Sequence, residues 1–290
     1  MPDDHGTGTI ATALHDLRGE LPPSERRVAR TILDGYPVAG IGTLAELAGR
    51  ARVSSPTVLR LVNRLGYAGF GEFQRALLAE VEARLATTSS AMPAASPADG
   101  HIVRTLLNEA AANISADAAG LIPGEIDDVV ELLARSRTVV TIGGWLTQVF
   151  ARYLFITLQT MRPRCRCVGA AASSGAAELV DLGRRDALVV FDARPYGAAT
   201  EELCTWARAR GVRIVLVTDA WLSPIARQAS HVLVARSASA SPFDSYAPMF
   251  ALVEAVVAAV AARLGDGAQR RIAETEALLE RWEWRPDAGR

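Results

Sequence analysis

The spacing of hydrophobic positions changes near residue 138. From residue 10 to about residue 86, apolar side chains recur every three or four positions, which is typical of amphipathic helices. Two more helical segments follow, at 101–121 and 125–136. Beyond residue 138, short continuous apolar runs alternate with helical segments. These runs are TVVTIG at 138–143, CRCV at 165–168, ALVVFD at 187–192, RIVLVTD at 213–219 and HVLVA at 231–235.

Short apolar runs between amphipathic helices are typical of βαβ units in a parallel sheet with both faces covered. The pattern therefore predicts an all-α N-terminal domain and a C-terminal α/β domain with a five-stranded parallel sheet flanked by helices. A segment rich in Ala, Ser and Pro separates the two, so we expect domains at 1–86 and 101–290 joined by a linker at 87–100. Ligands of open parallel sheets bind beyond the carboxyl ends of the strands, at the switch point.

Residues 43–66 predict two short helices joined by a tight turn. Thr43 is followed three residues later by Glu46, which is the spacing of a capping box. Ser54 is a second N-cap candidate, and Pro56 is tolerated in the first turn of the helix that follows. This arrangement predicts a helix-turn-helix.

The second of these helices has an apolar face and a basic face. Its apolar positions repeat at i, i+3, i+4 and i+7, and Gly66 follows them as a helix-ending glycine. The opposite face is basic, with no acidic residue between Arg50 and Arg64. Arginine can read guanine, asparagine can read adenine, and serine or threonine can hold phosphate, so this face is predicted to contact the major groove of DNA. The alternative is a solvated face of an ordinary helical bundle. The apolar stripe is Val58, Leu61, Val62 and Leu65, and the DNA-contacting candidates are Arg52, Ser54, Ser55, Thr57, Arg60, Asn63 and Arg64.

Composition narrows the function classes. The net charge is −1, so any nucleic-acid binding must come from a local surface. Three cysteines without a framework fit a reduced cytoplasm, and the acidic N-terminus predicts no signal peptide. The apolar run at 247–264 contains Glu254 and many alanines, so we expect a buried helix and no membrane partner.

Three stretches carry a family resemblance: PSERRVARTIL, TLAELAGRARVSSPTVLRLVNRLGY and GFGEFQRAL. They resemble the N-terminal domain of MurR/RpiR family bacterial transcription regulators. In that family a sugar isomerase (SIS) domain follows and senses phosphorylated sugars. The resemblance implies a cytoplasmic regulator that binds double-stranded operator DNA and a small-molecule effector. Regulators of this kind act as homodimers or homotetramers, because two-fold symmetry places two recognition helices one turn of DNA apart.

The loops of the second half depart from the SIS pattern. The loop after the first strand of a SIS domain usually reads G-x-G-x-S, but Trp145 stands at the serine position. The loop after the third strand usually reads S-x-S-G-x-T and forms a phosphate cradle, but Asp192 and Arg194 replace the serines and Pro195 replaces the glycine. An ionised Asp192 would repel a phosphate unless Arg194 neutralises it. The effector-binding candidates are Gly143, Gly144, Trp145, Ser173, Ser174, Asp192, Arg194 and Tyr196.

Three interpretations of this domain stay open. It binds another ligand, such as an acidic or unphosphorylated sugar derivative; it has lost ligand binding and serves in assembly; or it binds a phosphosugar through Ser173, Ser174 and Arg194. The alternative from another class is an aldose–ketose isomerase with Glu178 as the base, although a glutamate in a first helical turn is ordinary. No cofactor, metal or catalytic site is expected, since Cys165 and Cys167 have no further ligand close in sequence.

A final helix is predicted near the C-terminus. Its apolar residues form either an assembly surface or a contact with the domain's own sheet. They are Leu278, Leu279, Trp282 and Trp284.

Overall fold

The computed structural model divides into two compact units. It describes residues 9–33, 36–85, 101–169, 176, 177, 179–241 and 243–281. The first unit comprises the described residues up to Gly120, together with Ala220–Leu222 and Arg236–Pro248. The second unit comprises Leu121–Asp219, Ser223–Ala235 and the described residues from Met249 on. The predicted linker at 87–100 lies outside the described residues.

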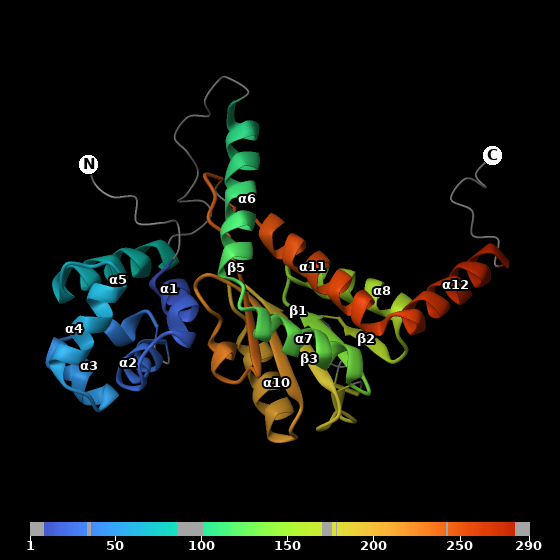
Figure 1. The fold of residues 1–290 in the computed structure, drawn as a ribbon, viewed down its shortest axis with the longest axis horizontal. Helices are drawn as coiled ribbons and strands as arrows, with labels where there is room; N and C mark the ends of the chain where they lie inside the picture. Colours follow the sequence, from blue (N-terminus) through green and yellow to red (C-terminus); the bar gives the residue numbers. More distant parts are fainter. Residues whose placement is uncertain are drawn as a thin grey trace. The chain divides into compact units, whose positions relative to one another are not determined.

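The first unit is helical (Figure 1). Its helices are α1 (Ile10–Asp16), α2 (Pro23–Leu33), α3 (Leu44–Ala51), α4 (Ser55–Arg64), α5 (Phe70–Leu85) and α6 (His101–Gly120). The side chains of Ile32, Leu47, Leu61 and Phe73 meet in one core, which joins helices α2 to α5. Within α4, Val58, Leu61 and Val62 are buried as the spacing predicts, whereas Leu65 is half-buried.

The start of α3 and the end of α4 follow the sequence signals, whereas Ser54 stands at the N-cap position of α4 but makes no side-chain capping hydrogen bond. The Thr43 hydroxyl accepts a hydrogen bond from the Glu46 N–H (3.2 Å), and the Glu46 carboxylate accepts one from the Thr43 N–H (2.7 Å), which confirms the capping box. After α4, the Gly66 N–H donates to the Asn63 carbonyl and the Tyr67 N–H to the Val62 carbonyl. This is a Schellman motif, and the φ of 91° at Gly66 explains the glycine.

The second unit contains the predicted five-stranded parallel sheet, in the order β2-β1-β3-β4-β5. The fold prediction is confirmed. Because the chain runs outward from β1 to β2 and then returns to β3, the switch point lies between β1 and β3. The strands are β1 (Val139–Gly143), β2 (Cys165–Val168), β3 (Ala187–Asp192), β4 (Arg213–Asp219) and β5 (His231–Ala235).

Helices cover both faces of this sheet (Figure 1). On one face, Cys204 and Ala207 of α10 (Ala198–Ala209) belong to the same core as Leu188 and Ile214. On the other face, side chains of α7, α8 and α11 surround a small apolar space with Val189 and Val215 of the sheet. These helices are α7 (Pro123–Arg135), α8 (Gln148–Met161) and α11 (Ala247–Leu264), and α12 (Asp266–Arg281) packs on α8.

Helix α11 is long and apolar enough to cross a membrane by length and composition, with a mean hydropathy of 1.8. Its residues Leu252, Val253 and Val256 face the sheet instead. The packing against β3 and β4 therefore accounts for the third of this helix that is buried.

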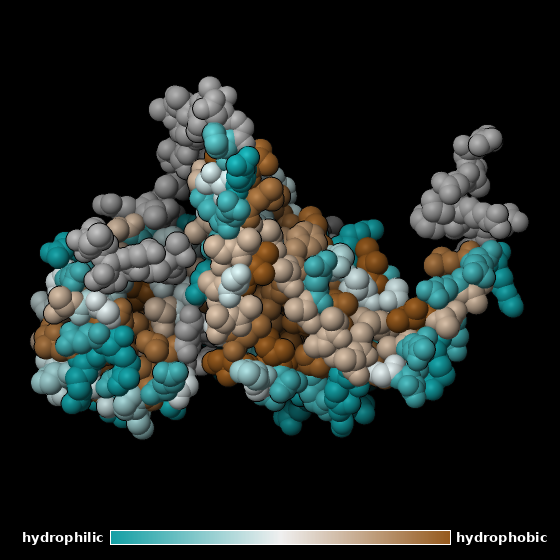
Figure 2. Space-filling model, turned by 45° about the horizontal axis from the view of Figure 1, so that its top comes forward, coloured by the Kyte–Doolittle hydropathy of each residue, from teal (hydrophilic) through white to brown (hydrophobic). Residues whose placement is uncertain are grey.

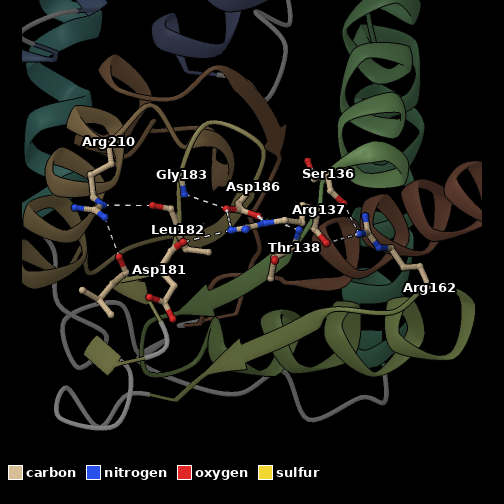
Figure 3. A network of polar contacts seen from close by, with 10 residues as sticks. Ser136, Arg137, Thr138, Arg162, Asp181, Leu182, Gly183, Asp186 and Arg210 are labelled. Atoms are coloured by element: carbon tan, nitrogen blue, oxygen red, sulfur yellow. Dashed lines mark hydrogen bonds and ion pairs between the residues drawn. The ribbon is translucent and has the colours of Figure 1, made fainter.

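A polar network closes the amino-terminal edge of the sheet (Figure 3). The buried Asp186 carboxylate accepts hydrogen bonds from the Arg137 guanidinium at 3.0 and 2.8 Å and from the Thr138 N–H at 3.1 Å. The Arg162 guanidinium donates to the carbonyls of Leu133 and Ser136. Burial alone would raise the pKa of Asp186, but the hydrogen bonds that its carboxylate accepts from Arg137 and Thr138 outweigh burial and lower the pKa. The network fixes β1 against β3 at the edge opposite the switch point.

Glu80 gives the helical unit a pH-dependent stability. Its carboxylate accepts the Ile10 N–H at 2.8 Å, and burial raises its pKa to about 7. Because the folded pKa lies above the unfolded one, this stability is complete below about pH 4.5 and is lost as the pH rises through 7.

Glu80→Gln keeps an acceptor for Ile10 and removes the charge. We expect Glu80→Gln to melt about 2–4 °C above the wild type at pH 8 and together with it at pH 4.

The control for this experiment is Glu20→Gln, which changes an exposed carboxylate of the same unit. Melting curves of the three proteins at both pH values provide the measurement. A Glu80→Gln variant that follows the wild type at pH 8 would contradict the assignment.

Candidate DNA-binding face and effector site

The outer face of α4 carries exposed basic and polar side chains. The side chains of Arg60 and Arg64 are 64% and 44% exposed, and Asn63 between them is exposed as well. Arg52 and Ser54, in the turn before the helix, are also exposed, and Ser55 is half-buried. Arg52 has a φ of 54°, a left-handed conformation that turns the chain from α3 into α4.

Thr57, predicted as a DNA-contacting residue, does not lie on this exposed face. It is buried, because it lies four residues before Leu61 and therefore on the apolar stripe. Its hydroxyl pairs with the Ser54 hydroxyl at 3.0 Å and accepts a hydrogen bond from the Arg60 guanidinium at 3.0 Å. Thr57 thus orients Arg60 from inside.

A buried acid beneath the face was missed by the sequence reasoning. Glu25 of α2 is 4% exposed; its carboxylate accepts a hydrogen bond from the Arg64 guanidinium at 3.0 Å and lies 4.0 Å from that of Arg60. The pair with Arg64 spans 39 positions, so no local pattern could announce it. Glu25 holds the two guanidinium groups side by side and offsets part of their charge.

In the loop after β1, backbone N–H groups donate hydrogen bonds to side chains of the same segment. The Gly143 N–H donates to the Gln148 side chain at 3.1 Å, and the Gly144 N–H donates to the Thr147 hydroxyl at 2.8 Å. A Cβ on Gly143 would lie 2.5 Å from the Thr147 carbonyl oxygen, so the close approach requires glycine. Trp145 is 85% exposed at the tip of this loop.

Asp192 ends β3 next to the switch point. It is 3% exposed, and its carboxylate accepts a hydrogen bond from the Ser223 hydroxyl at 2.5 Å and one from the Gly197 N–H. Burial raises its pKa to about 6, against the lowering effect of these hydrogen bonds. The Ser223 hydroxyl also accepts the Ile225 N–H, so it caps the turn after β4.

Asp219 ends the neighbouring strand β4 and is fully buried. Its carboxylate accepts hydrogen bonds from the Arg194 N–H at 2.9 Å and from the Tyr196 hydroxyl at 2.6 Å, and the Arg194 guanidinium lies 3.8 Å away. The sequence left open whether Arg194 neutralises Asp192, and the structure pairs Arg194 with Asp219. Sequence reasoning missed Asp219, although adjacent parallel strands that both end in aspartate could have signalled it.

Two further candidates, Ser173 and Ser174, lie outside the described residues, as does Glu178. Within the described ranges, no group of three or more His, Cys, Asp or Glu side chains is arranged to hold a metal ion. The structure thus brings Gly143, Gly144 and Trp145 of one loop to the same sheet edge as Asp192, Arg194 and Tyr196 of another, because β1 and β3 pair directly.

Comparisons with known proteins match both halves of the chain. Residues 8–84 match the helix-turn-helix domain of the rpiR family, and residues 132–259 match the SIS domain. An HTH-type transcriptional regulator of Haemophilus influenzae is 22% identical over 237 residues, which cover 79% of this chain and 80% of the relative. Another HTH-type transcriptional regulator, from Providencia stuartii, is 35% identical over 69 residues, or 24% of each chain.

Two solved structures share the fold. The sugar isomerase domain of an RpiR transcription factor from Sphaerobacter thermophilus aligns with a TM-score of 0.58 and 24% identity, covering 61% of this chain and 98% of that one. The Vibrio vulnificus NanR protein, complexed with ManNAc-6P, aligns with a TM-score of 0.57 and 17% identity over 95% and 99% of the two chains. The chain belongs to the RpiR family of transcriptional regulators and joins an rpiR-type helix-turn-helix domain to a SIS domain.

Proposed function

We propose that α4 enters the major groove of a specific operator and that the SIS domain adjusts this binding in response to a small molecule. The observation that carries the proposal is the exposed face of Arg60, Asn63 and Arg64 on the second helix of the helix-turn-helix. Arg60 and Asn63 are placed to read base edges, while Arg52 and Ser54 precede the helix, where phosphate contacts are expected. Ser55 and Arg64 complete the proposed contact set.

The proposed effector is a sugar or a sugar-derived metabolite. The NanR protein was solved with ManNAc-6P, and its likeness to this chain supports a ligand at the carboxyl edge of the sheet. Trp145 offers an exposed ring at that edge, and an indole can stack on the apolar face of a sugar. Isomerase activity has less support, because the carboxylates described at this edge are engaged by hydroxyl and backbone donors.

We further propose a cytoplasmic homodimer or homotetramer, with functional domains at 1–86 and 101–290. Leu278 and Leu279 of α12 are 56% and 47% exposed, and Figure 2 shows hydrophobic residues toward the end of that helix among hydrophilic ones. Since neither leucine is buried in the single chain, an assembly surface accounts for them better than a contact with the sheet. Trp282 and Trp284 lie outside the described residues.

Arg60→Ala tests the placement of α4. If Arg60 reads a base, the change should weaken operator binding by about 1–3 kcal/mol and relax the preference at one base position. Arg52→Ala should weaken binding to all sequences alike and reduce the salt dependence, because a phosphate contact carries no sequence information. Fluorescence anisotropy titrations at fixed salt, with selected operator and scrambled DNA, measure both effects.

The matched control is Arg152→Ala, which removes an exposed arginine from α8 of the other unit. It should bind the operator as the wild type does. Unchanged operator affinity in both Arg60→Ala and Arg52→Ala would show that α4 is not the reading helix.

Arg64→Ala should act on stability as well as on DNA. It removes a hydrogen-bond donor from the buried Glu25 carboxylate, and an unsatisfied buried acceptor costs about 1–3 kcal/mol. We expect the lower end, because Arg64 is partly exposed and Arg60 remains nearby. Urea unfolding measures the loss, and the double change Glu25→Gln with Arg64→Ala should recover part of it. A single variant as stable as the wild type would contradict the role of Glu25.

Operator binding should require an oligomer. A single DNA-binding module buries about 600–1,000 Å² of its surface, which is small for an operator complex. Sedimentation velocity at micromolar concentration should give at least a dimer, and Leu278→Glu with Leu279→Glu should shift it toward the monomer. A wild-type monomer that binds the operator tightly would contradict this prediction.

A further inference from the structure

The loop between β3 and α10 directs its donors inward, to two aspartates of its own chain. Its backbone N–H at Arg194 and its hydroxyl at Tyr196 donate to Asp219, and its N–H at Gly197 donates to Asp192. Pro195 has no N–H to offer. A loop at the carboxyl end of a parallel strand would otherwise present these groups to a bound anion.

The geometry at Asp219 is that of an occupied anion site. One backbone N–H, one phenolic hydroxyl and one guanidinium converge on a single carboxylate, at 2.9, 2.6 and 3.8 Å. The carboxylate is fully buried, so little solvent screens these interactions. Asp219 therefore fills, from β4, the place that an external anion would need in order to use Arg194.

The neighbouring loop engages its two glycine N–H groups in the same way. The backbone N–H groups of Gly143 and Gly144 are taken by the side chains of Gln148 and Thr147. The Thr147 hydroxyl in turn donates to the Phe191 carbonyl at 2.7 Å, which ties this loop to the end of β3. Both described loops at the switch point are thus held by hydrogen bonds within the chain.

The negative charge of acidic side chains at this edge also disfavours a bound anion. Asp192 and Asp219 lie close enough for each to affect the other electrostatically, and Glu201 in the first turn of α10 adds a third acid near Asp192. The guanidinium of Arg194 already lies 3.8 Å from the Asp219 carboxylate. A phosphate dianion that entered here would meet buried carboxylates in a medium of low dielectric constant, where repulsion is strong.

We infer that Asp192 and Asp219 are built-in anions that exclude phosphorylated ligands from the β3–α10 loop, so that the effector of this domain carries no phosphate group at that position. The inference rests on the proposed function in that it assumes a small-molecule effector at this edge. It makes the two aspartates specificity-determining residues and assigns the ligand to sugar derivatives that present no phosphate to this loop.

The test is a gain of binding in charge-neutral variants. Asp219→Asn and Asp192→Asn are nearly isosteric, and each keeps one acceptor oxygen for its donors. Calorimetric titration of the full chain with glucose 6-phosphate should give no binding for the wild type at millimolar ligand. Each variant should bind at least ten-fold more tightly than the wild type, which corresponds to about 1.4 kcal/mol. Adding Arg194→Ala to Asp219→Asn should abolish the gain, because the guanidinium that pairs with Asp219 is the group expected to bind the phosphate.

Asp181→Asn is the matched control, since it removes one exposed charge near the opposite edge of the sheet and should gain nothing. Melting curves establish that the variants are folded, and Asp192→Asn still decides the matter if Asp219→Asn unfolds. Wild-type protein that binds glucose 6-phosphate as tightly as the variants would overturn the inference. Folded variants that gain no affinity would overturn it too, because the aspartates would then not be what excludes the phosphate. Failure of the proposed function has a different signature: an operator affinity that no ligand changes, beside an intact gain of phosphate binding.

Discussion

Burial of both faces of the parallel sheet is the constraint on which the second unit depends. Helices α7, α8 and α11 cover one face and α10 covers the other, so the sheet meets a ligand at its edges. The amino edge is closed by Arg137 and Asp186 (Figure 3), which leaves the carboxyl edge at the switch point between β1 and β3. In this chain the described loops at that edge are held by internal acceptors. We therefore propose that a ligand binds at this edge and that the aspartates restrict which ligand fits.

In the helical unit, too, the packing of apolar side chains determines which polar side chains face outward. The stripe of Val58, Leu61 and Val62 orients α4, and burying that stripe turns Arg60 and Asn63 outward. Beneath this face Glu25 and Thr57 hold Arg60 in place from the protein side. Long arginine side chains lose conformational freedom when they bind, so holding Arg60 in advance would reduce the entropy lost in the proposed DNA contact.

Sequence patterns predicted what depends on local spacing. The five strands, the capping box at Thr43 and the glycine at 66 all follow from periodicity or from one turn of chain. Contacts between distant residues could not be predicted this way. Glu25 meets Arg64 across 39 positions and Asp219 meets Arg194 across 25, and both pairs depend on which elements pack together. Thr57 was misplaced for a simpler reason: its polar side chain suggested the outer face, whereas its position put it on the buried stripe.

We propose that a DNA-binding unit, whose outer α4 face is built on a buried stripe, is joined to a SIS domain that selects a ligand by charge. Recognition of specific DNA is the part of this proposal on which the rest depends. The most direct measurement is sequencing of the genomic fragments that the purified full chain retains at physiological salt. We expect strong enrichment of a few sites with two-fold symmetric half-sites about one helical turn apart, each upstream of a gene. Retention of fragments without any shared sequence, or of none, would contradict it.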